Sequence, residues 1–374
     1  MRRSLLALIP LALLTAAAPA SATLRVDGRG WGHGIGLSQY GAYGYARDDG
    51  RGHAWILEHY YPGTTLARSG AGAVRVRLTS SRRPSFCGAT RVRGASGRRV
   101  RLSGRHVYRF TRGGSGYVVR DLTTRRLRAR VAAPATVTGG ASWCLRGRAD
   151  NGVRDGAYRG SAQLLRTGRR GVLVVNRVGL EDYLRGVVPA EMPASWPSEA
   201  LEAQAVIARS YALRARNAGA QYDVYADTRS QVYGGVGSEV AAASAAVAAT
   251  RGEIVTYGGQ VAQTYFFSTS GGRTAANEEI WGGAPVPYLR SVADPYDRLS
   301  PYHRWSVRFR DREAARRLAD VAPGKLRSLK VVARTASGRA AVVAVRGRRG
   351  TARVSAATIQ SALGLRSTWF SIRR

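Results

Sequence analysis

One glutamate stands out because its neighbours could make it a useful acid. Glu191 follows Val187-Val-Pro-Ala190 and precedes Met192-Pro193, and Trp196 lies five residues further on. Apolar surroundings raise the pKa of a carboxyl group, so this side chain could protonate a leaving oxygen, as cleavage of a glycosidic bond requires. On local sequence alone, an exposed loop carboxylate is the simpler interpretation.

A glycine-rich run near the start of the chain carries a histidine that could contact a ligand. The run Gly32-His-Gly-Ile-Gly-Leu-Ser-Gln-Tyr-Gly-Ala42 lacks the lysine of a phosphate-binding loop, and no apolar strand leads from it into a capped helix. His33, with Ser38 and Gln39 nearby, offers hydrogen-bonding groups beside glycines that let a ligand approach closely. The alternative is a glycine-rich turn with a structural histidine.

Two further sets of residues invite a metal or catalytic role, and we reject both. His53 and His59 flank Glu58 but lie six positions apart, so they do not share a helix face as zinc ligands at i and i+4 would. The run Phe267-Ser-Thr-Ser-Gly-Gly272 offers a serine nucleophile, but no histidine is singled out as its base. The two glycines favour a tight turn beside a cleft.

The elements that must position these residues alternate between helices and strands. Ser198 to Arg216 is the clearest helix, because Pro197 suits its first turn and Glu199 suits its dipole. Gln204 interrupts its stripe of small residues and is either hydrogen-bonded in the core or directed into a cleft. Shorter helices are expected over residues 39–47, 54–61, 180–187, 239–250, 312–319 and 356–363. Strands are expected over residues 172–178, 253–257, 261–268, 302–309, 329–334 and 340–346, so the fold class is α+β.

Residues from about Val74 to Ala162 follow a different pattern. Short runs alternate apolar residues with arginines, which predicts antiparallel strands with the arginines on a solvated face. Both cysteines, Cys87 and Cys144, lie in this block, and in an exported protein we expect a disulfide between them. Two buried or metal-binding thiols are the alternative, although no CxxC pattern supports a zinc knuckle.

The beginning of the chain has the pattern of a signal peptide. Basic residues at positions 2 and 3 precede an apolar run from Leu5 to Ala18 and a small-residue site that ends at Ala22. The run is shorter than the roughly 20 apolar residues that a membrane span needs. We therefore expect a secreted protein with four parts: a signal peptide over residues 1–22, a segment over 23–70, the β-rich block over 71–165 and a main domain over 166–374.

The chain is strongly basic, with a formal net charge of +36 and only two lysines, Lys325 and Lys330. Such a balance favours a polyanion as partner, although GC-rich coding also produces an arginine bias. Nucleic acid is the usual candidate. Export makes anionic wall polymers the better one, and we expect no specific nucleic acid.

Four motifs taken together resemble the SpoIID/LytB family. The most specific is the long segment from Val187 to Tyr211, which contains Glu191. The others are Asp227-Thr-Arg-Ser-Gln-Val-Tyr233, Ser268-Thr-Ser-Gly-Gly272 with Trp281, and the glycine-rich run from Gly32 to Ala42. The resemblance covers roughly residues 172–370 and 27–66, and leaves the β-rich block unexplained.

The order of these motifs differs from that of the family members. In them the glycine-histidine motif and the segment like Ile56-Leu-Glu-His-Tyr-Tyr61 come last, whereas here they precede the glutamate motif. The resemblance therefore implies a circular permutation, in which the segment after residue 22 pairs with the C-terminal strand ending near Ile372 and rebuilds the same fold.

The resemblance implies a peptidoglycan lytic transglycosylase, in which Glu191 is the acid that cleaves glycan strands between N-acetylmuramic acid and N-acetylglucosamine. It gives Arg209 a substrate-contacting or orienting role. The groove would be lined by Gln204, Arg209, Gln231, Tyr233, Ser270, His33 and Gln39. Some relatives bind zinc, but Phe267 stands here where histidine often occurs, so we expect no metal and no cofactor. The LytB branch implies the alternative, a wall-binding protein that stimulates an N-acetylmuramoyl-L-alanine amidase and cuts nothing itself.

Overall fold

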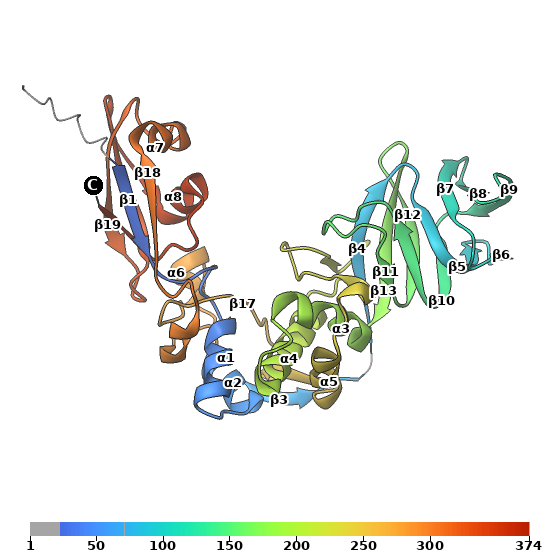
Figure 1. Cartoon of the computed structure of the whole chain (residues 1–374), viewed down its shortest axis with the longest axis horizontal. Coiled ribbons are helices and arrows are strands. Elements are labelled where there is room, and N and C mark those ends of the chain that lie inside the picture. The colour runs from blue at the N-terminus through green and yellow to red at the C-terminus, as the bar shows by residue number, and fades with distance from the viewer. Residues whose placement is uncertain (1–22, 71, 374) are drawn as a thin grey trace, which may run out of the picture.

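Two lobes that contain β-sheets rise from a helical base, so that the chain has the outline of a broad U (Figure 1). This computed structural model describes residues 23–70 and 72–373. The signal peptide expected over residues 1–22 lies outside them. We call the three parts the β-lobe, the helical base and the C-terminal lobe. The α+β class is confirmed.

The β-lobe is built from Ala73–Gly179, and the sheet order is β14-β4-β13-β12-β10-β5-β7-β8-β9, with β11 beside β10 and β6 beside β5. Its strands are β4 (Ala73–Ser81), β5 (Ser85–Gly94), β6 (Arg99–Arg101), β7 (Tyr108–Gly113), β8 (Gly116–Asp121), β9 (Leu127–Ala132), β10 (Ala135–Arg146), β11 (Ala157–Tyr158), β12 (Ser161–Thr167) and β13 (Gly171–Gly179). In β4 the residues Val74, Val76 and Leu78 are buried and the arginines between them are not. The period-two prediction is therefore confirmed.

The expected disulfide between Cys87 and Cys144 is also confirmed. The two cysteines face each other across β5 and β10, with their Cα atoms 5.0 Å apart. The boundary expected at residue 165 falls inside the sheet, because Ser161–Thr167 pairs along its whole length with Gly171–Gly179.

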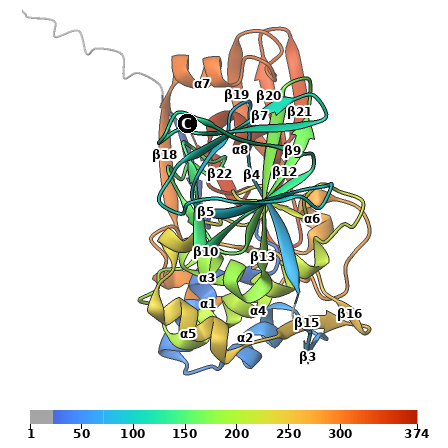
Figure 2. The same cartoon turned by 90° about the vertical axis from the view of Figure 1, so that its right-hand side faces the viewer.

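The helical base lies below both lobes (Figure 2). Its helices are α1 (Gln39–Asp48), α2 (His53–Tyr60), α3 (Leu180–Glu191), α4 (Ser198–Arg214) and α5 (Ala241–Ala249), with the 3-10 turn η1 (Gly235–Ser238). Short strands join them: β2 (Leu37–Ser38), β3 (Thr65–Arg68), β15 (Glu253–Tyr257), β16 (Gln260–Val261) and β17 (Phe266–Phe267). β14 (Val224–Tyr225) follows α4 in the chain and pairs with β4 at the edge of the β-lobe sheet. Helix α4 is buried on most of its circumference, so it forms the centre around which the base packs.

The C-terminal lobe contains two three-stranded sheets and its own hydrophobic core. One sheet has the order β18 (Trp305–Arg310), β1 (Thr23–Gly28), β22 (Phe370–Arg373), and the other has β19 (Leu326–Arg334), β20 (Ala340–Gly347), β21 (Gly350–Ser355). Helices α7 (Asp311–Arg317) and α8 (Ala356–Leu363) pack on them. Between this lobe and the base lie α6 (Asn277–Trp281) and η2 (Pro295–Leu299).

The first described strand lies inside the C-terminal lobe, as expected. β1 pairs antiparallel with β22, and Val26 stands opposite Ile372 (Figure 1). The pairing confirms that the two ends of the described chain complete one sheet. The circular permutation itself remains a prediction.

The strand expected over residues 261–268 is interrupted. Only β16 and β17 form, because the backbone between them bonds to separate elements rather than to one neighbouring strand. Thr264 donates its hydroxyl to the carbonyl of Ile207 in α4, and the carbonyl of Tyr265 accepts from the amide of Leu37. No helix among residues 23–70 and 72–373 is long and apolar enough to cross a membrane.

Replacing both cysteines of the disulfide, as Cys87→Ser with Cys144→Ser, is expected to destabilise the protein. The bridge closes a segment with a sequence separation of 57, and loop-closure entropy gives an upper value of about 4 kcal/mol for such a loop. Urea unfolding of the oxidised protein against the double variant measures the difference. Equal midpoints would contradict a stabilising bridge, and the reduced wild type should match the variant.

Candidate active site

Glu191 lies in a hollow of about 600 Å³ on the helical base. The wall combines the glycine-rich run, the end of α3, the loop before Gln231, and the segment from β17 to α6. The lining residues are Trp31, Gly32, His33, Gln39, Glu191, Tyr211, Thr228, Arg229, Ser230, Tyr265, Phe266, Phe267, Ser268 and Trp281. The sequence had linked Glu191, His33 and Gln39, and the structure brings these three together.

Glu191 is the last residue of α3, four residues beyond the helix end expected from the sequence. The next residue, Met192, is extended, with φ −128° and ψ 142°, because Pro193 disfavours a helical conformation in the residue before it. Pro193 therefore determines where the helix stops, whereas Pro189 lies inside it. This leaves the carboxyl group at the helix end, directed into the hollow.

Burial raises the pKa of Glu191, and a hydrogen bond from the amide of Val232 to its Oε1, 2.9 Å long, opposes that rise in part. The position at a helix C-terminus acts in the same direction as burial, because the negative end of the helix dipole disfavours an anion. The side chain is thus held in one place and keeps its proton to a higher pH than a free glutamate. Those are the properties of a general acid.

His33 is neutral and has no free ring nitrogen. Burial lowers its pKa to about 4. Its Nε2 lies 3.0 Å from the carbonyl oxygen of Phe266 and its Nδ1 lies 3.0 Å from the amide of Ile35, so Nε2 carries the proton and Nδ1 accepts. Because both nitrogens are engaged, His33 shapes the wall of the hollow and does not relay protons.

The glycines around His33 let the run pass close to the opposite wall. Gly32 and Gly36 have φ values of +113° and +77°. A Cβ at Gly32 would lie 2.7 Å from Cβ of Phe267, and one at Gly36 would overlap the carbonyl of Tyr265. The glycine-rich composition is therefore a packing requirement of this wall.

Two tryptophans flank the hollow and are among the most exposed large apolar side chains of the described residues. Trp31 is 46% exposed and Trp281 is 51% exposed. The Trp281 ring lies 4.6 Å from that of Tyr265 and 5.3 Å from that of His33, and Trp31 lies 4.7 Å from Tyr302. Exposed aromatic surface around a hollow is typical of a ligand-binding groove. Trp281 and Tyr211 belong to the family motifs but were not predicted to line the hollow, and Trp31 and Tyr265 were not singled out from the sequence.

Two glutamines, Gln39 and Gln204, meet next to Glu191, and a third, Gln231, lies in a separate contact. Nε2 of Gln39 donates to the carbonyl of Glu191 at 3.1 Å and approaches Oε1 of Gln204 at 3.4 Å. Gln231 accepts from the hydroxyl of Tyr183 at 3.1 Å, and both Gln204 and Gln231 are fully buried. Of the two possibilities for Gln204, the core position is the one observed. Gln39, which Gln204 contacts, thus supports the backbone carbonyl of Glu191.

Three other expected site residues lie outside the hollow. Arg209 is fully buried and forms a two-pronged ion pair with Glu181, at 2.9 and 2.8 Å, in the first turn of α3. Tyr233 is buried and donates to Asn176 at 3.0 Å. Ser270 is buried, and its hydroxyl accepts from the amide of Gly272. Arg209 fits the orienting half of its expected role, because it fixes the start of the helix that ends at Glu191.

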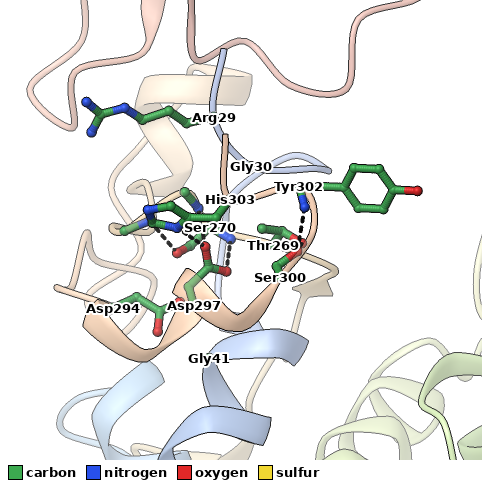
Figure 3. A network of polar contacts seen from close by, with 12 residues as sticks. Arg29, Gly30, Gly41, Thr269, Ser270, Asp294, Asp297, Ser300, Tyr302 and His303 are labelled. Atoms are coloured by element: carbon green, nitrogen blue, oxygen red, sulfur yellow. Dashed lines mark hydrogen bonds and ion pairs between the residues drawn. The ribbon is translucent and has the colours of Figure 1, made fainter. Parts of the chain in front are cut away.

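A buried aspartate that the sequence did not single out holds one wall in place (Figure 3). Asp297 in η2 accepts from the amides of Ser270 and Gly271 at 2.7 and 2.8 Å, and from Nδ1 of His303 at 2.9 Å. It also accepts from the hydroxyl of Ser38 at 3.1 Å. Four donors from three segments thus converge on one carboxylate.

Glu191 is the only carboxylate, and Arg229 the only cation, in the lining of the hollow as far as the chain is described. Arg229 pairs with Asp227 through two contacts of 2.8 and 2.6 Å and lies over the Tyr225 ring at 3.8 Å. A two-carboxylate glycosidase places a second acid opposite the first. The described lining of the hollow contains no such second acid.

His53 and His59, rejected above as a zinc pair, contact different parts of the molecule. Nδ1 of His53 lies 3.0 Å from Glu202 and 3.4 Å from Glu199. One nitrogen or oxygen atom from each of these three residues lies within 4.8 Å of the other two. His59 instead approaches the carbonyl of Ala293 at 2.8 Å. The His53 group ties α2 to α4, away from the hollow.

Asp294, which accepts from the hydroxyl of Tyr60 at 2.9 Å, predicts how stability depends on pH. Burial and the nearby Asp297 raise its pKa to about 7 from 3.8. The folded state therefore holds this proton more tightly than the unfolded state, so stability from this group is present below pH 4 and is lost as pH rises to about 7.

Asp294→Asn is accordingly expected to stabilise the protein at pH 8 and to leave it unchanged at pH 4. The gain is a few kcal/mol at most, at about 1.4 kcal/mol per pH unit. Urea unfolding across this range measures it, with the exposed Asp320→Asn as control. A gain that does not depend on pH would show that Asp294 does not titrate in this window.

Comparison with known proteins finds similarity in the middle of the chain. Residues 168–257 match the family model "Stage II sporulation protein", SpoIID. Stage II sporulation protein D of Bacillus subtilis (strain 168) is 32% identical over 217 residues, which are 54% of this chain and 62% of that protein. The amidase enhancer of the same organism is 39% identical over 124 residues, 33% of this chain and 16% of that protein. An uncharacterized protein of Brachyspira hyodysenteriae (strain ATCC 49526 / WA1) is 45% identical over 124 residues, 32% of this chain and 33% of that protein.

The chain thus spans less than two thirds of the length of these curated relatives. The matched region runs from the turn before β13 to the end of β15. It contains Glu191, Gln204, Arg209, Gln231 and Tyr233, and it excludes the glycine-rich wall with His33 and Gln39. Over residues 168–257 the chain is therefore similar to the SpoIID family, with further similarity to Stage II sporulation protein D and to an amidase enhancer.

Proposed function

We propose that this protein is a secreted lytic transglycosylase that cleaves the glycan strands of peptidoglycan, with Glu191 as general acid and base. The observation that carries the proposal is the single protonatable carboxylate in the hollow. A hydrolase needs a second carboxylate to supply a nucleophile or to activate water. A transglycosylase needs only one, because the nucleophile belongs to the substrate.

The reaction then has two proton transfers through one residue. Glu191 donates its proton to the oxygen that joins C1 of N-acetylmuramic acid to N-acetylglucosamine, and the C1–O bond breaks. The C6 hydroxyl of the same muramic acid attacks C1, and its proton passes to Glu191. One C–O bond breaks and one forms, no water is consumed, and the carboxyl group ends in its initial state.

The rest of the hollow suits a sugar chain. Trp31 and Trp281 offer apolar faces on which pyranose rings can rest. Arg229 offers a charge for the lactyl carboxylate that muramic acid exposes once its peptide has been removed. The neutral His33 adds no charge at this position. Secretion to the cell wall rests on the expected signal peptide and on the family.

Glu191→Gln is expected to abolish cleavage while leaving the fold intact. The amide has nearly the shape of the carboxyl group but no proton to donate, and loss of a general acid costs about 10²- to 10⁴-fold in rate. Mass spectrometry of products from peptide-free glycan strands measures 1,6-anhydro-muramoyl ends. Glu58→Gln, an exposed glutamate in α2, is the matched control. Anhydro products from Glu191→Gln at the wild-type rate would exclude Glu191 as the acid.

Trp281→Ala is expected to weaken substrate binding without changing the chemistry. Loss of one exposed aromatic contact corresponds to a rise in KM of about two- to tenfold, with kcat nearly unchanged. Tyr257→Ala removes an exposed aromatic residue outside the hollow and should behave as wild type. The kinetics of soluble product release test both variants. A fall in kcat at constant KM would place Trp281 in the catalytic step instead.

The second candidate function is stimulation of an amidase, which the match to an amidase enhancer favours. A stimulating protein binds glycan and the amidase and needs no acid. Wild type and Glu191→Gln would then stimulate an N-acetylmuramoyl-L-alanine amidase equally, and neither would release anhydro products. Stimulation lost together with cleavage would instead assign both effects to the transglycosylase.

A further inference from the structure

The β-lobe carries most of the positive charge of the chain. Residues 73–179 contain 25 arginines, three aspartates, and neither lysine nor glutamate, which gives a net charge of +22. The whole chain has a net charge of +36. Fewer than a third of the residues thus hold more than half of the charge, and this lobe contains none of the lining of the Glu191 hollow.

Seven of these arginines gather around two adjoining hollows at one end of the sheet. One hollow, of about 640 Å³, is lined by Arg82, Arg83, Arg109, Arg112, Arg120, Arg169 and Arg170. The other, of about 590 Å³, shares Arg82, Arg169 and Arg170 with it. The arginines come from the end of β4, the β12–β13 turn and the β7–β8 hairpin. We call the joined hollows the arginine groove.

The arginine groove has no internal counter-charge. None of its seven guanidinium groups pairs with a carboxylate among the described residues, and no acidic residue lines either hollow. A larger hollow on the C-terminal lobe, of about 790 Å³, differs in this respect, because its Asp27 pairs with Arg25 and approaches Arg373.

The arrangement costs stability. Within the groove, Arg109 and Arg120 stand directly opposite each other on β7 and β8. Like charges directly opposite across strands are destabilising. Packing between these strands therefore does not explain the arginines. A bound anion would offset the repulsion between their guanidinium groups.

The lining of the groove also indicates which anion fits. Apart from the arginines it contains only serine, threonine and glycine, and no aromatic residue. Recognition of single-stranded nucleic acid relies on aromatic side chains that stack on the bases. Arginine forks match the paired oxygens of a phosphate group, and a row of them matches repeated phosphates.

We propose that the arginine groove binds a linear phosphodiester polymer without bases, of the kind that anionic cell walls contain. The groove would hold the protein on the wall while Glu191 acts on the glycan. The binding does not depend on Glu191, so it can hold or fail independently of the proposed enzymatic activity.

The experiment compares two fourfold variants of the full protein. The groove variant is Arg82→Gln, Arg83→Gln, Arg169→Gln and Arg170→Gln. The control variant is Arg98→Gln, Arg105→Gln, Arg126→Gln and Arg154→Gln, which removes four exposed arginines of the same lobe that line none of these hollows. All eight side chains are exposed, so circular dichroism and thermal unfolding should match those of wild type.

Affinity is measured by calorimetry for poly(glycerol phosphate), for single-stranded DNA with the same number of phosphates, and for poly-glutamate. We expect poly(glycerol phosphate) to bind tightest. The groove variant should lose at least about tenfold in affinity and should have a shallower dependence on salt, while the control variant should lose much less.

Three results would overturn the proposal. Equal losses in both variants would mean a diffuse charge effect with no site. Tighter binding of DNA than of poly(glycerol phosphate) would assign the groove to nucleic acid. Binding of poly-glutamate as tight as that of poly(glycerol phosphate) would show that the groove does not select phosphate.

Discussion

The carboxylate of Asp297 holds together the chain segments that build one wall of the Glu191 hollow. Its partners are the hydroxyl of Ser38, the amides of Ser270 and Gly271, and the ring of His303. Ser38 and Asp297 are 259 residues apart in the sequence. A buried carboxylate is tolerated only when donors surround it, so none of these segments can move alone without leaving the charge uncompensated. The pairing of β2 with β17 and the close approach of Gly32 to Phe267 follow from this fixed position.

The opposite wall depends on a second buried charge. Arg209 in α4 reaches Glu181 in the first turn of α3 and the carbonyl of Glu253 in β15, so α3 is fixed at its start by its neighbours. Met192 and Pro193 end the same helix at Glu191. The acid is therefore positioned by helix geometry at both ends of α3. Burial at this position raises its pKa, and this rise requires no second acid nearby.

Sequence patterns predicted what depends on local spacing. The period-two runs of the β-lobe, the disulfide, and helices α1, α2, α4 and α8 were recovered to within two residues. The family motif singled out Glu191, and the expected residues His33 and Gln39 line the same hollow. Patterns failed where a contact joins distant segments. Asp297 is an ordinary loop aspartate in the sequence, and Trp31 lines the hollow where its backbone pairs with that of the distant Thr269. Arg209 illustrates the same limit, because its motif indicates importance but not that the side chain points into the core.

The charge of the protein poses a question for the acid, since a field of +36 should favour the ionised form of Glu191 and lower its pKa. The positions of the arginines resolve it. Exposed charges are screened beyond a Debye length of about 8 Å. More than half of the net charge belongs to the β-lobe, which extends away from the base (Figure 1). Arg229, the single cation in the described lining of the hollow, pairs with Asp227, which lies outside the lining. Desolvation is thus the largest influence on Glu191. A strongly cationic protein can thus hold a glutamate whose pKa is raised by burial, because most of its net charge lies in a lobe that does not line the hollow.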